Sequence, residues 1–354
     1  MSTVTGAVTT DPAGGPSATP PSSRLGGYWQ RLLSGSWVPI VVATVVLFLV
    51  SPLVAPGSLG PTLLTMLPIA GVLALVSVGQ TLVVQQRGLD MSIPGMVALA
   101  ASLSTALPSF YGWPLWLGVL FGIVMPGVVG LINGAIITYL RVMPIVVTLG
   151  MNSVLLGVVF FVNSGTPAGS PDELNRFAIL NIFGFIPSIF LIAAVVVVIA
   201  GIASRKTIPG RRLGYVGVSL PASAALGIRV NRYAMLAYAL AGVAYGIGGV
   251  LYAGFVKTPP LFPGDQFLLP SVAAVVLGGT ALTGGVASIV ATGVGALFLQ
   301  QLTQLLRSLG WQDAPQYIAM AAVLIAVVLI RELVPQLWRW IRSRQAGRQR
   351  VAAV

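Results

Sequence analysis

Apolar segments long enough to cross a bilayer follow one another along most of this chain. About 20 residues of helix span the hydrocarbon core, and lipid admits only structures that satisfy their own backbone hydrogen bonds. The sequence therefore predicts an all-α polytopic membrane protein with about ten transmembrane helices. The third and eighth segments are short and flanked by Gly and Pro, so we expect either to be broken or re-entrant. The segments lie near 37–56, 62–85, 92–108, 114–138, 144–162, 183–204, 233–254, 269–283, 286–306 and 315–334.

Missing residue types exclude several kinds of chemistry. Only 7% of the residues are charged, against about a quarter in a soluble domain. The chain has no Cys and no His, which excludes disulfides, Cys or His metal sites and His-based catalysis. Neither Lys206 nor Lys257 follows a glycine-rich phosphate-binding loop. We therefore expect a chain that is not an enzyme and that holds no cofactor of its own.

The basic residues indicate how the segments are oriented. With ten spans and a cytosolic N-terminus, only Arg176, Lys257 and Arg307 lie outside, and all other Lys and Arg lie on the cytosolic side. A missed or added span would spoil this segregation, so both termini are predicted to be cytoplasmic. The net charge of +12 then reflects topology and contact with anionic lipid rather than nucleic acid.

Both ends of the chain differ from the membrane domain at 37–335. Residues 1–36 are rich in Ser, Thr, Pro and Gly and indicate a disordered cytosolic tail. Residues 336–354 are predicted to form a basic cytosolic tail.

Small residues recur at spacings of four within the spans. The pairs are Gly118/Gly122, Gly130/Gly134 and Gly242/Gly246. Association of helices in lipid depends on close approach of their backbones, so these pairs predict tightly packed helices.

Polar residues inside or beside the spans are the candidates for a site. Asp90 precedes a span, with Ser92 as a plausible N-cap and Pro94 in the first turn. This segment is either a simple cap or a polar corner at a gate. Asn133 lies within a span, and Thr148 and Asn152 share one helix face, with Ser153 beside them. Hydrogen bonds between helices and a solute pathway explain these residues about equally well.

Two glycine-containing connections complete the candidate segments. The loop 205–232 is the longest predicted cytosolic connection and carries basic residues on both flanks. It predicts two short helices around a glycine break, forming either a knob for a cytosolic partner or a surface against lipid headgroups. Within 264–286, glycine pairs at 278–279 and 284–285 bracket a short turn, which close packing explains most simply.

Taken together, these segments resemble the monosaccharide permeases of ABC importers, the ribose-permease family. This family belongs to a superfamily shared with branched-chain amino-acid permeases. The resemblance covers about 60–335, in order, and includes the loop from Gly210 to Arg232. The stretches that carry it are GLDMSIPGMVALAAS, GLINGAIITYLRVMPIVVTLG and AAVVLGGTALTGG.

The resemblance implies a permease subunit in a bacterial cytoplasmic membrane that forms the pathway for a monosaccharide or similar polyol. A second permease chain, cytosolic ATPase subunits that bind ATP and Mg, and an extracytoplasmic solute-binding protein are the implied partners. The ATPase is expected to dock on the loop at 205–232. Residues implied for docking are Arg211, Arg212, Gly227, Ile228 and Arg232, and those implied for the pathway or gate are Gln80, Asp90, Ser92, Asn133, Asn152 and Ser153.

The sequence departs from the family at two places. The family's loop usually carries Asn-Pro-Glu-Ala-Ala, whereas residues 219–223 read Ser-Leu-Pro-Ala-Ser and lack the glutamate. An acid often precedes the AAVVLGG stretch, where Leu268 stands here, and Asp265 is the nearest carboxylate.

Three other functions compete with a sugar permease. A branched-chain amino-acid permease is the nearest, although the Leu-Asp-x-Ser pattern favours sugars. A secondary transporter working alone usually needs intramembrane charges, and here Asp90 and Asp265 lie only at predicted membrane edges. An intramembrane enzyme would lack His, Cys and a convincing pair of acids.

Overall fold

The computed structural model describes residues 37–56, 59–182, 184–312, 314–323, 325–326 and 329. The tails predicted at 1–36 and 336–354 lie outside these residues. The described structure is almost entirely helical, and residues 314–323 are helical as well. In chain order the elements are α2 (Val38–Val54), η1 (Gly60–Thr62), α3 (Leu63–Gln85), α4 (Ile93–Tyr111), α5 (Leu115–Tyr139), α6 (Pro144–Val162), α7 (Asp172–Ile179), β1 (Asn181–Ile182), β2 (Ile186–Pro187), α8 (Ser188–Lys206), α9 (Ile208–Val218), α10 (Leu220–Ala225), α11 (Val230–Val256), α12 (Asp265–Leu277) and α13 (Ile289–Ser308).

A helix occupies each of the first nine predicted spans, and another begins where the tenth was expected. Seven of the described helices, α3, α4, α5, α6, α8, α11 and α13, are long and apolar enough to cross a membrane. The apolar helices α2 and α12 are shorter. The multi-pass helical architecture is therefore confirmed.

The two segments expected to be broken behave differently. The third is one continuous helix, α4, which runs through Pro108 to Tyr111. The proline made the segment look shorter than it is, so the expectation of a break there was wrong. The eighth is the short helix α12, which ends at Leu277, just before the glycine-containing turn.

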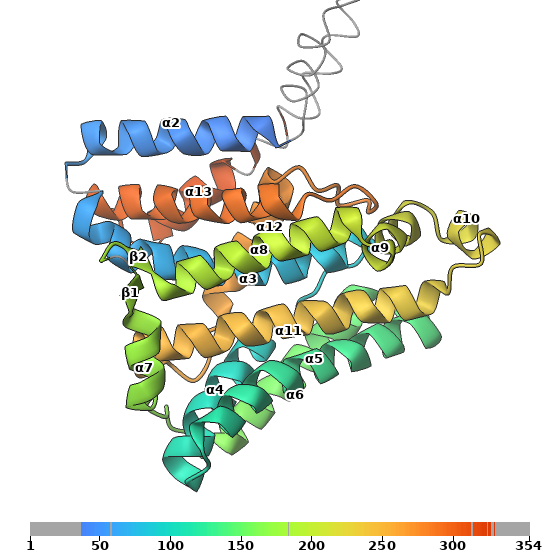
Figure 1. Ribbon diagram of the computed structural model, residues 1–354, viewed down its shortest axis with the longest axis horizontal. Helices are drawn as coiled ribbons and strands as arrows, with labels where there is room; N and C mark the ends of the chain where they lie inside the picture. Colours follow the sequence, from blue (N-terminus) through green and yellow to red (C-terminus); the bar gives the residue numbers. More distant parts are fainter. Residues whose placement is uncertain are drawn as a thin grey trace, which may run out of the picture.

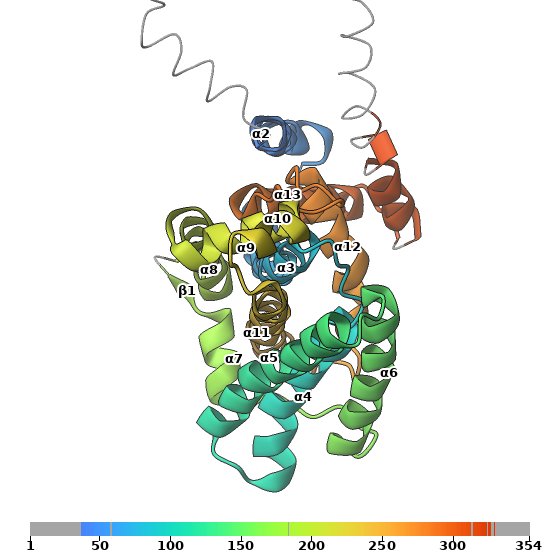
Figure 2. The ribbon, with the colours of Figure 1, turned by 90° about the vertical axis from the view of Figure 1, so that its right-hand side faces the viewer.

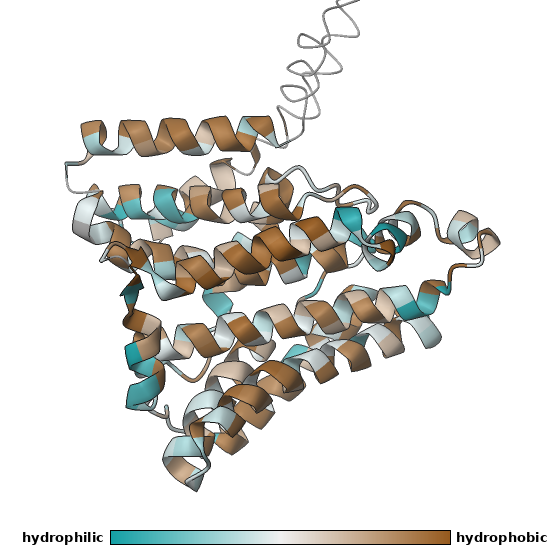
Figure 3. Ribbon diagram, in the orientation of Figure 1, coloured by the Kyte–Doolittle hydropathy of each residue, from teal (hydrophilic) through white to brown (hydrophobic). Residues whose placement is uncertain are grey.

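Helix α3 lies in the interior of the bundle. It packs against α8, α11, α12 and α13, while α11 packs on its other side against α4 and α5 (Figures 1 and 2). In the membrane-length window of α3, 89% of the residues are buried, against 17% in α6. The outer helices carry apolar side chains along their exposed faces (Figure 3), as a lipid-facing surface requires.

The predicted glycine pairs are located where helices approach most closely. A Cβ on Gly242 would lie 2.0 Å from the carbonyl oxygen of Pro126, and one on Gly130 would lie 2.1 Å from that of Tyr238. Both contacts join α5 to α11. A Cβ on Gly118 would lie 3.0 Å from the carbonyl oxygen of Leu103 in α4. The sequence prediction of tight packing is confirmed, because no larger residue fits at this spacing.

The sequence did not predict the short elements between α6 and α8. Helix α7 carries Asp172 and Glu173 in its first turn and Arg176 in its last, each favourable to the helix dipole. It packs against α11, and Asn175 donates to the carbonyl of Gly254 at 2.7 Å. Strands β1 and β2 pair antiparallel next to it. Figure 1 shows α7 and α10 at opposite ends of the bundle.

Candidate functional site

The connection between α3 and α4 turns into the protein and buries a carboxylate. Asp90 is fully buried, and its Oδ1 accepts hydrogen bonds from the backbone N–H of Ser92 at 2.9 Å and from the Ser92 hydroxyl. Asn133, from α5, donates to the same hydroxyl at 3.1 Å. Ser92 occupies the N-cap position of α4, but its side chain makes no capping bond there. The segment thus forms a polar corner held by a side-chain network rather than by a simple cap, and its place at a gate stays a prediction.

Helix α6 supplies the cap that Ser92 does not. The Asn152 side-chain oxygen accepts from the N–H of Gly95 at 2.8 Å, in the first turn of α4. Thr148 accepts from the N–H of Met91 at 3.0 Å. Because Thr148 and Asn152 are one turn apart on the same face, they hold the whole 91–95 segment. Interhelical hydrogen bonding, one of the two explanations left open by the sequence, is what this face does here.

The corner has more hydrogen-bonding capacity than the surrounding residues use. Asp90 Oδ2, Asn133 Oδ1 and the Tyr238 hydroxyl are buried without a partner among the described residues. Such atoms are uncommon in native proteins. Burial raises the pKa of Asp90 to about 6, and the two bonds from Ser92 oppose that rise. The ionised form of Asp90 is thus energetically unfavourable here. A small movement of α5, which carries Asn133, or of α11, which carries Tyr238, would change the surroundings of this carboxyl group.

The remaining pathway candidates lie elsewhere. Gln80 is buried between α3 and α11 and accepts from the Tyr245 hydroxyl at 3.2 Å. Ser153 is exposed and donates back to the carbonyl of Leu149. The structure thus brings Asp90, Ser92, Asn133 and Asn152 together and leaves Gln80 and Ser153 apart from them.

The loop 205–232 forms two short helices at the end of the bundle. Thr207 caps α9 by accepting from the N–H of Gly210 at 3.2 Å, and Ser219 caps α10 by accepting from that of Ala222 at 3.3 Å. The break between them falls at Ser219, not at a glycine as predicted, because a capping hydroxyl is enough to start a new helix. Gly227, with φ of 73°, follows α10 instead.

We call the protruding helices α9 and α10, with residues 226–229 and Arg232, the knob (Figure 1). Arg211, Arg212, Gly227 and Arg232 are exposed on it, and Ile228 is half-buried. Exposed apolar side chains, which the sequence analysis missed, lie between the arginines. They are Tyr215, Val218, Leu220 and Leu226, the last 74% exposed.

Arg87 joins the knob to the end of α3. Its Nε donates to the carbonyl of Gly217 at 3.0 Å, and its Nη2 donates to that of Val218. These carbonyls are at the C-terminal end of α9, where a cation is favourable. Gln86 adds a bond to the carbonyl of Leu213 at 2.9 Å. No local sequence pattern predicts this contact, because the partners are 130 residues apart.

The glycine-containing turn after α12 completes the same junction. The N–H of Gly285 donates to the carbonyl of Gln85 at 3.0 Å, and the Gln85 side chain returns a bond to the carbonyl of Gly285 at 3.2 Å. Gly284 has a φ of 88°, and a Cβ there would lie 2.3 Å from Arg87 Cγ. Three distant segments therefore meet backbone to backbone directly beneath the knob.

Comparisons with known proteins place these features in a wider context. A family model described as "Branched-chain amino acid transport system / permease component" matches residues 62–330. No solved structure gives a significant match.

Three curated relatives align with most of the chain. The fructose import permease protein of Bifidobacterium longum is 29% identical over 280 residues, which cover 77% of this chain and 78% of the relative. The galactofuranose transporter permease protein of Escherichia coli is 28% identical over 320 residues, covering 87% and 93%. The ribose import permease protein of Escherichia coli is 29% identical over 262 residues, covering 73% and 81%.

Proposed function

The chain belongs to the family of branched-chain amino acid transport system permease components, and we propose that it is the membrane-spanning permease subunit of an ATP-driven ABC importer for a monosaccharide or similar small polyol. The alignment with the fructose, galactofuranose and ribose permeases over most of the chain carries this proposal. The names of these relatives favour sugars over the branched-chain amino acids named in the family description. As a permease, the chain is a transport component and not an enzyme.

The knob supports docking of a cytosolic ATPase. Apolar side chains exposed outside the spans are typical of protein interfaces, and basic ones around them fit a partner with acidic residues. The segment 205–232 contains six basic residues and no acid. ATP and Mg would be bound by that partner, because this chain has no phosphate-binding loop.

The junction beneath the knob suggests how ATPase movement reaches the spans. A shift of α9 would pull on Arg87, which donates to a carbonyl of α9, and would reach the turn at Gly285 through Gln85, whose carbonyl accepts from the Gly285 N–H. Arg87 is three residues before Asp90, so the pull would continue into the corner that starts α4. Alternating access requires an element with two states whose equilibrium both the ATPase and the solute shift. The connection through Arg87 lies between the knob and the start of α4, where such an element is needed.

We further propose ten spans, cytoplasmic termini and a bacterial cytoplasmic membrane, with a second permease chain and an extracytoplasmic binding protein as partners. The position of α7 and α10 at opposite ends of the bundle supports the topology (Figure 1). With the knob in the cytosol, the segregation of basic residues follows the positive-inside rule.

Uptake by whole cells tests the proposed function. Cells with and without this chain would be given labelled ribose, fructose, galactose and leucine, and the assay repeated with the partner ATPase inactivated. We expect uptake of one sugar to be lost in both cases. Loss of leucine uptake alone would assign the chain to amino acids, and uptake indifferent to the ATPase would refute the ABC assignment.

A further inference from the structure

A polar pocket opens between α3, α12, α13 and the helix at 314–323. It encloses a volume of about 80 Å³ and is open at its mouth, which is room for several water molecules, since one needs about 10–15 Å³. None of the residues predicted for the pathway lines it. Those that do are Ile69, Leu73, Gln266, Phe267, Pro270, Gln300, Thr303, Arg307, Gln316, Tyr317 and Met320.

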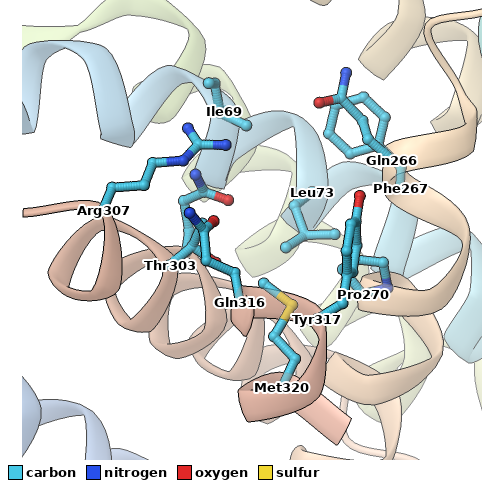
Figure 4. A pocket seen from close by; sticks show the side chains of 11 residues that line it. Ile69, Leu73, Gln266, Phe267, Pro270, Thr303, Arg307, Gln316, Tyr317 and Met320 are labelled. Carbon is cyan, nitrogen blue, oxygen red and sulfur yellow. The ribbon is translucent and has the colours of Figure 1, made fainter. Parts of the chain in front are cut away.

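The pocket is in the half of the bundle opposite the knob. Its residues come from the beginning of α3 and from the end of α13, whereas the end of α3 contacts α9. If the knob is cytosolic, the pocket faces the outside, where solute arrives. Figure 4 shows Arg307 and Thr303 on one side of it and Gln266, Phe267 and Tyr317 on the other.

The polar residues on α13 form a stripe along one face. Gln300, Thr303 and Arg307 follow a helical repeat of three and four residues, and all three line the pocket. Gln300 is only 9% exposed, and Gln316 across the pocket is 4% exposed and donates one hydrogen bond, from Nε2 to the carbonyl of Trp311 at 2.8 Å. Amides at membrane depth are costly unless they face a partner or a polar cavity, and they commonly mark solute pathways.

The chemistry of the lining suits a neutral polyhydroxyl solute. Three amides and the hydroxyls of Thr303 and Tyr317 donate and accept hydrogen bonds without charge, Arg307 adds further donors, and the aromatic rings offer a flat apolar face. None of the lining residues is acidic. The ammonium group of an amino acid would therefore lack the carboxylate that usually pairs with it, whereas a sugar needs none.

We propose that this pocket is a solute subsite on the outward side of the pathway, in which Gln300, Gln316 and Arg307 contact the hydroxyl groups of a passing sugar. The inference rests on the proposed function and gives it a location. It places the solute contact on the α12–α13 side of α3. The sequence had predicted it at the Asp90 corner, where the predicted residues bond to one another.

The natural absence of cysteine makes the test direct. Gln300→Cys and Gln316→Cys each introduce a single thiol into the pocket, and Gln304→Cys places one on α13 outside the lining. Whole cells with the complete importer would be treated with a membrane-impermeant methanethiosulfonate reagent, with and without ribose or fructose. We expect the carried sugar to slow labelling at 300 and 316 by the factor 1 + [sugar]/Kd, about tenfold when the sugar is at about ten times Kd. Labelling at 304 should not change.

Each other outcome has a separate meaning. If the wild-type chain carries a sugar but that sugar protects neither thiol, the pocket inference is wrong while the proposed function stands. If the wild-type chain carries leucine instead, the proposed function fails, and protection by leucine would overturn the polyol inference as well. Should the glutamine variants not assemble, Thr303→Cys makes the smallest change in the lining and decides by the same criteria.

Discussion

At the scale of single residues, Arg87 is the connection between the knob and the spans. It adopts a φ of 63° and bonds two carbonyls at the end of α9. Positive φ is unfavourable for a residue with a long side chain, so the contact with α9 has to compensate for it. A lysine could not reproduce the bond from Nε together with that from Nη2.

Arg87→Gln is expected to uncouple ATP hydrolysis from transport. Removing the guanidinium loses a helix-end interaction of about 0.3–1 kcal/mol and both hydrogen bonds to α9. We expect the ratio of sugar transported to ATP hydrolysed to fall severalfold in proteoliposomes, with the ATPase still bound. Arg141→Gln, at another arginine of positive φ, is the matched control. An unchanged ratio in Arg87→Gln would show that the contact transmits nothing.

Asp90 is expected to make stability depend on pH. Its folded-state pKa of about 6 is above the usual 3.8, so the folded protein binds the proton more tightly than the unfolded chain does. The destabilisation is absent below about pH 4 and complete above about pH 6. Asp90→Asn should therefore increase the free energy of unfolding at about pH 8, by at most about 3 kcal/mol, and hardly change it near pH 4. The measurement is the unfolding temperature at each pH. Asp265→Asn, at an exposed position, is the control. An equal gain at both pH values would contradict this account.

At the scale of elements, α9 and α10 carry the exposed surface proposed to bind the ATPase. Leu226→Glu places a charge in the exposed apolar patch without touching the core. We expect it to weaken association with the ATPase by about 1.4 kcal/mol or more, which is tenfold in Kd. Phe185→Glu, at another exposed apolar site near β2, should leave co-purification with the ATPase intact. Equal binding by both variants would remove the knob from the interface.

The contact between α5 and α11 sets a limit on side-chain size. In Gly242→Ala the new methyl group would lie 2.0 Å from the carbonyl oxygen of Pro126, so the helices must separate. In Gly157→Ala nothing lies within 4 Å, and helix propensity favours Ala by up to about 1 kcal/mol. The first variant should unfold at a lower temperature in detergent and the second should not. A reversed order would mean that the interface is looser than described.

At the scale of the whole molecule, opposite ends of the bundle should face opposite sides of the membrane. Glu173→Cys on α7 and Ala225→Cys on α10 expose single thiols at these ends. In intact cells an impermeant maleimide should label the first, and the second only after permeabilisation. Labelling of both thiols from outside would refute the ten-span topology. The test is needed because only seven of the described helices are long and apolar enough to cross a membrane by themselves.

The sequence predicted what depends on local pattern. Apolar runs located the long helices, and glycine spacing located the close contact between α5 and α11. It missed α7, because eight residues of which half are polar carry no membrane signal, and it ended α4 early at Pro108. It also selected Asp90, Ser92 and Asn133, which bond to one another. It passed over Gln300 and Gln316, which line one pocket, because the sequence does not distinguish one isolated glutamine from another. Which polar groups share a cavity depends on tertiary packing, which no local pattern reports.

The junction of Gln85 with Gly285 joins residues that are 200 positions apart. A ribosome therefore has to deliver more than three-quarters of the chain before that end of the permease can close. Until then the carbonyl of Gln85, at the end of α3, lacks the hydrogen bond from Gly285, and α9 lacks its contact with the turn at Gly285. Synthesis therefore sets an order of assembly: the junction beneath the knob forms only after residue 285 has been made, so a product that stops before it would lack this junction.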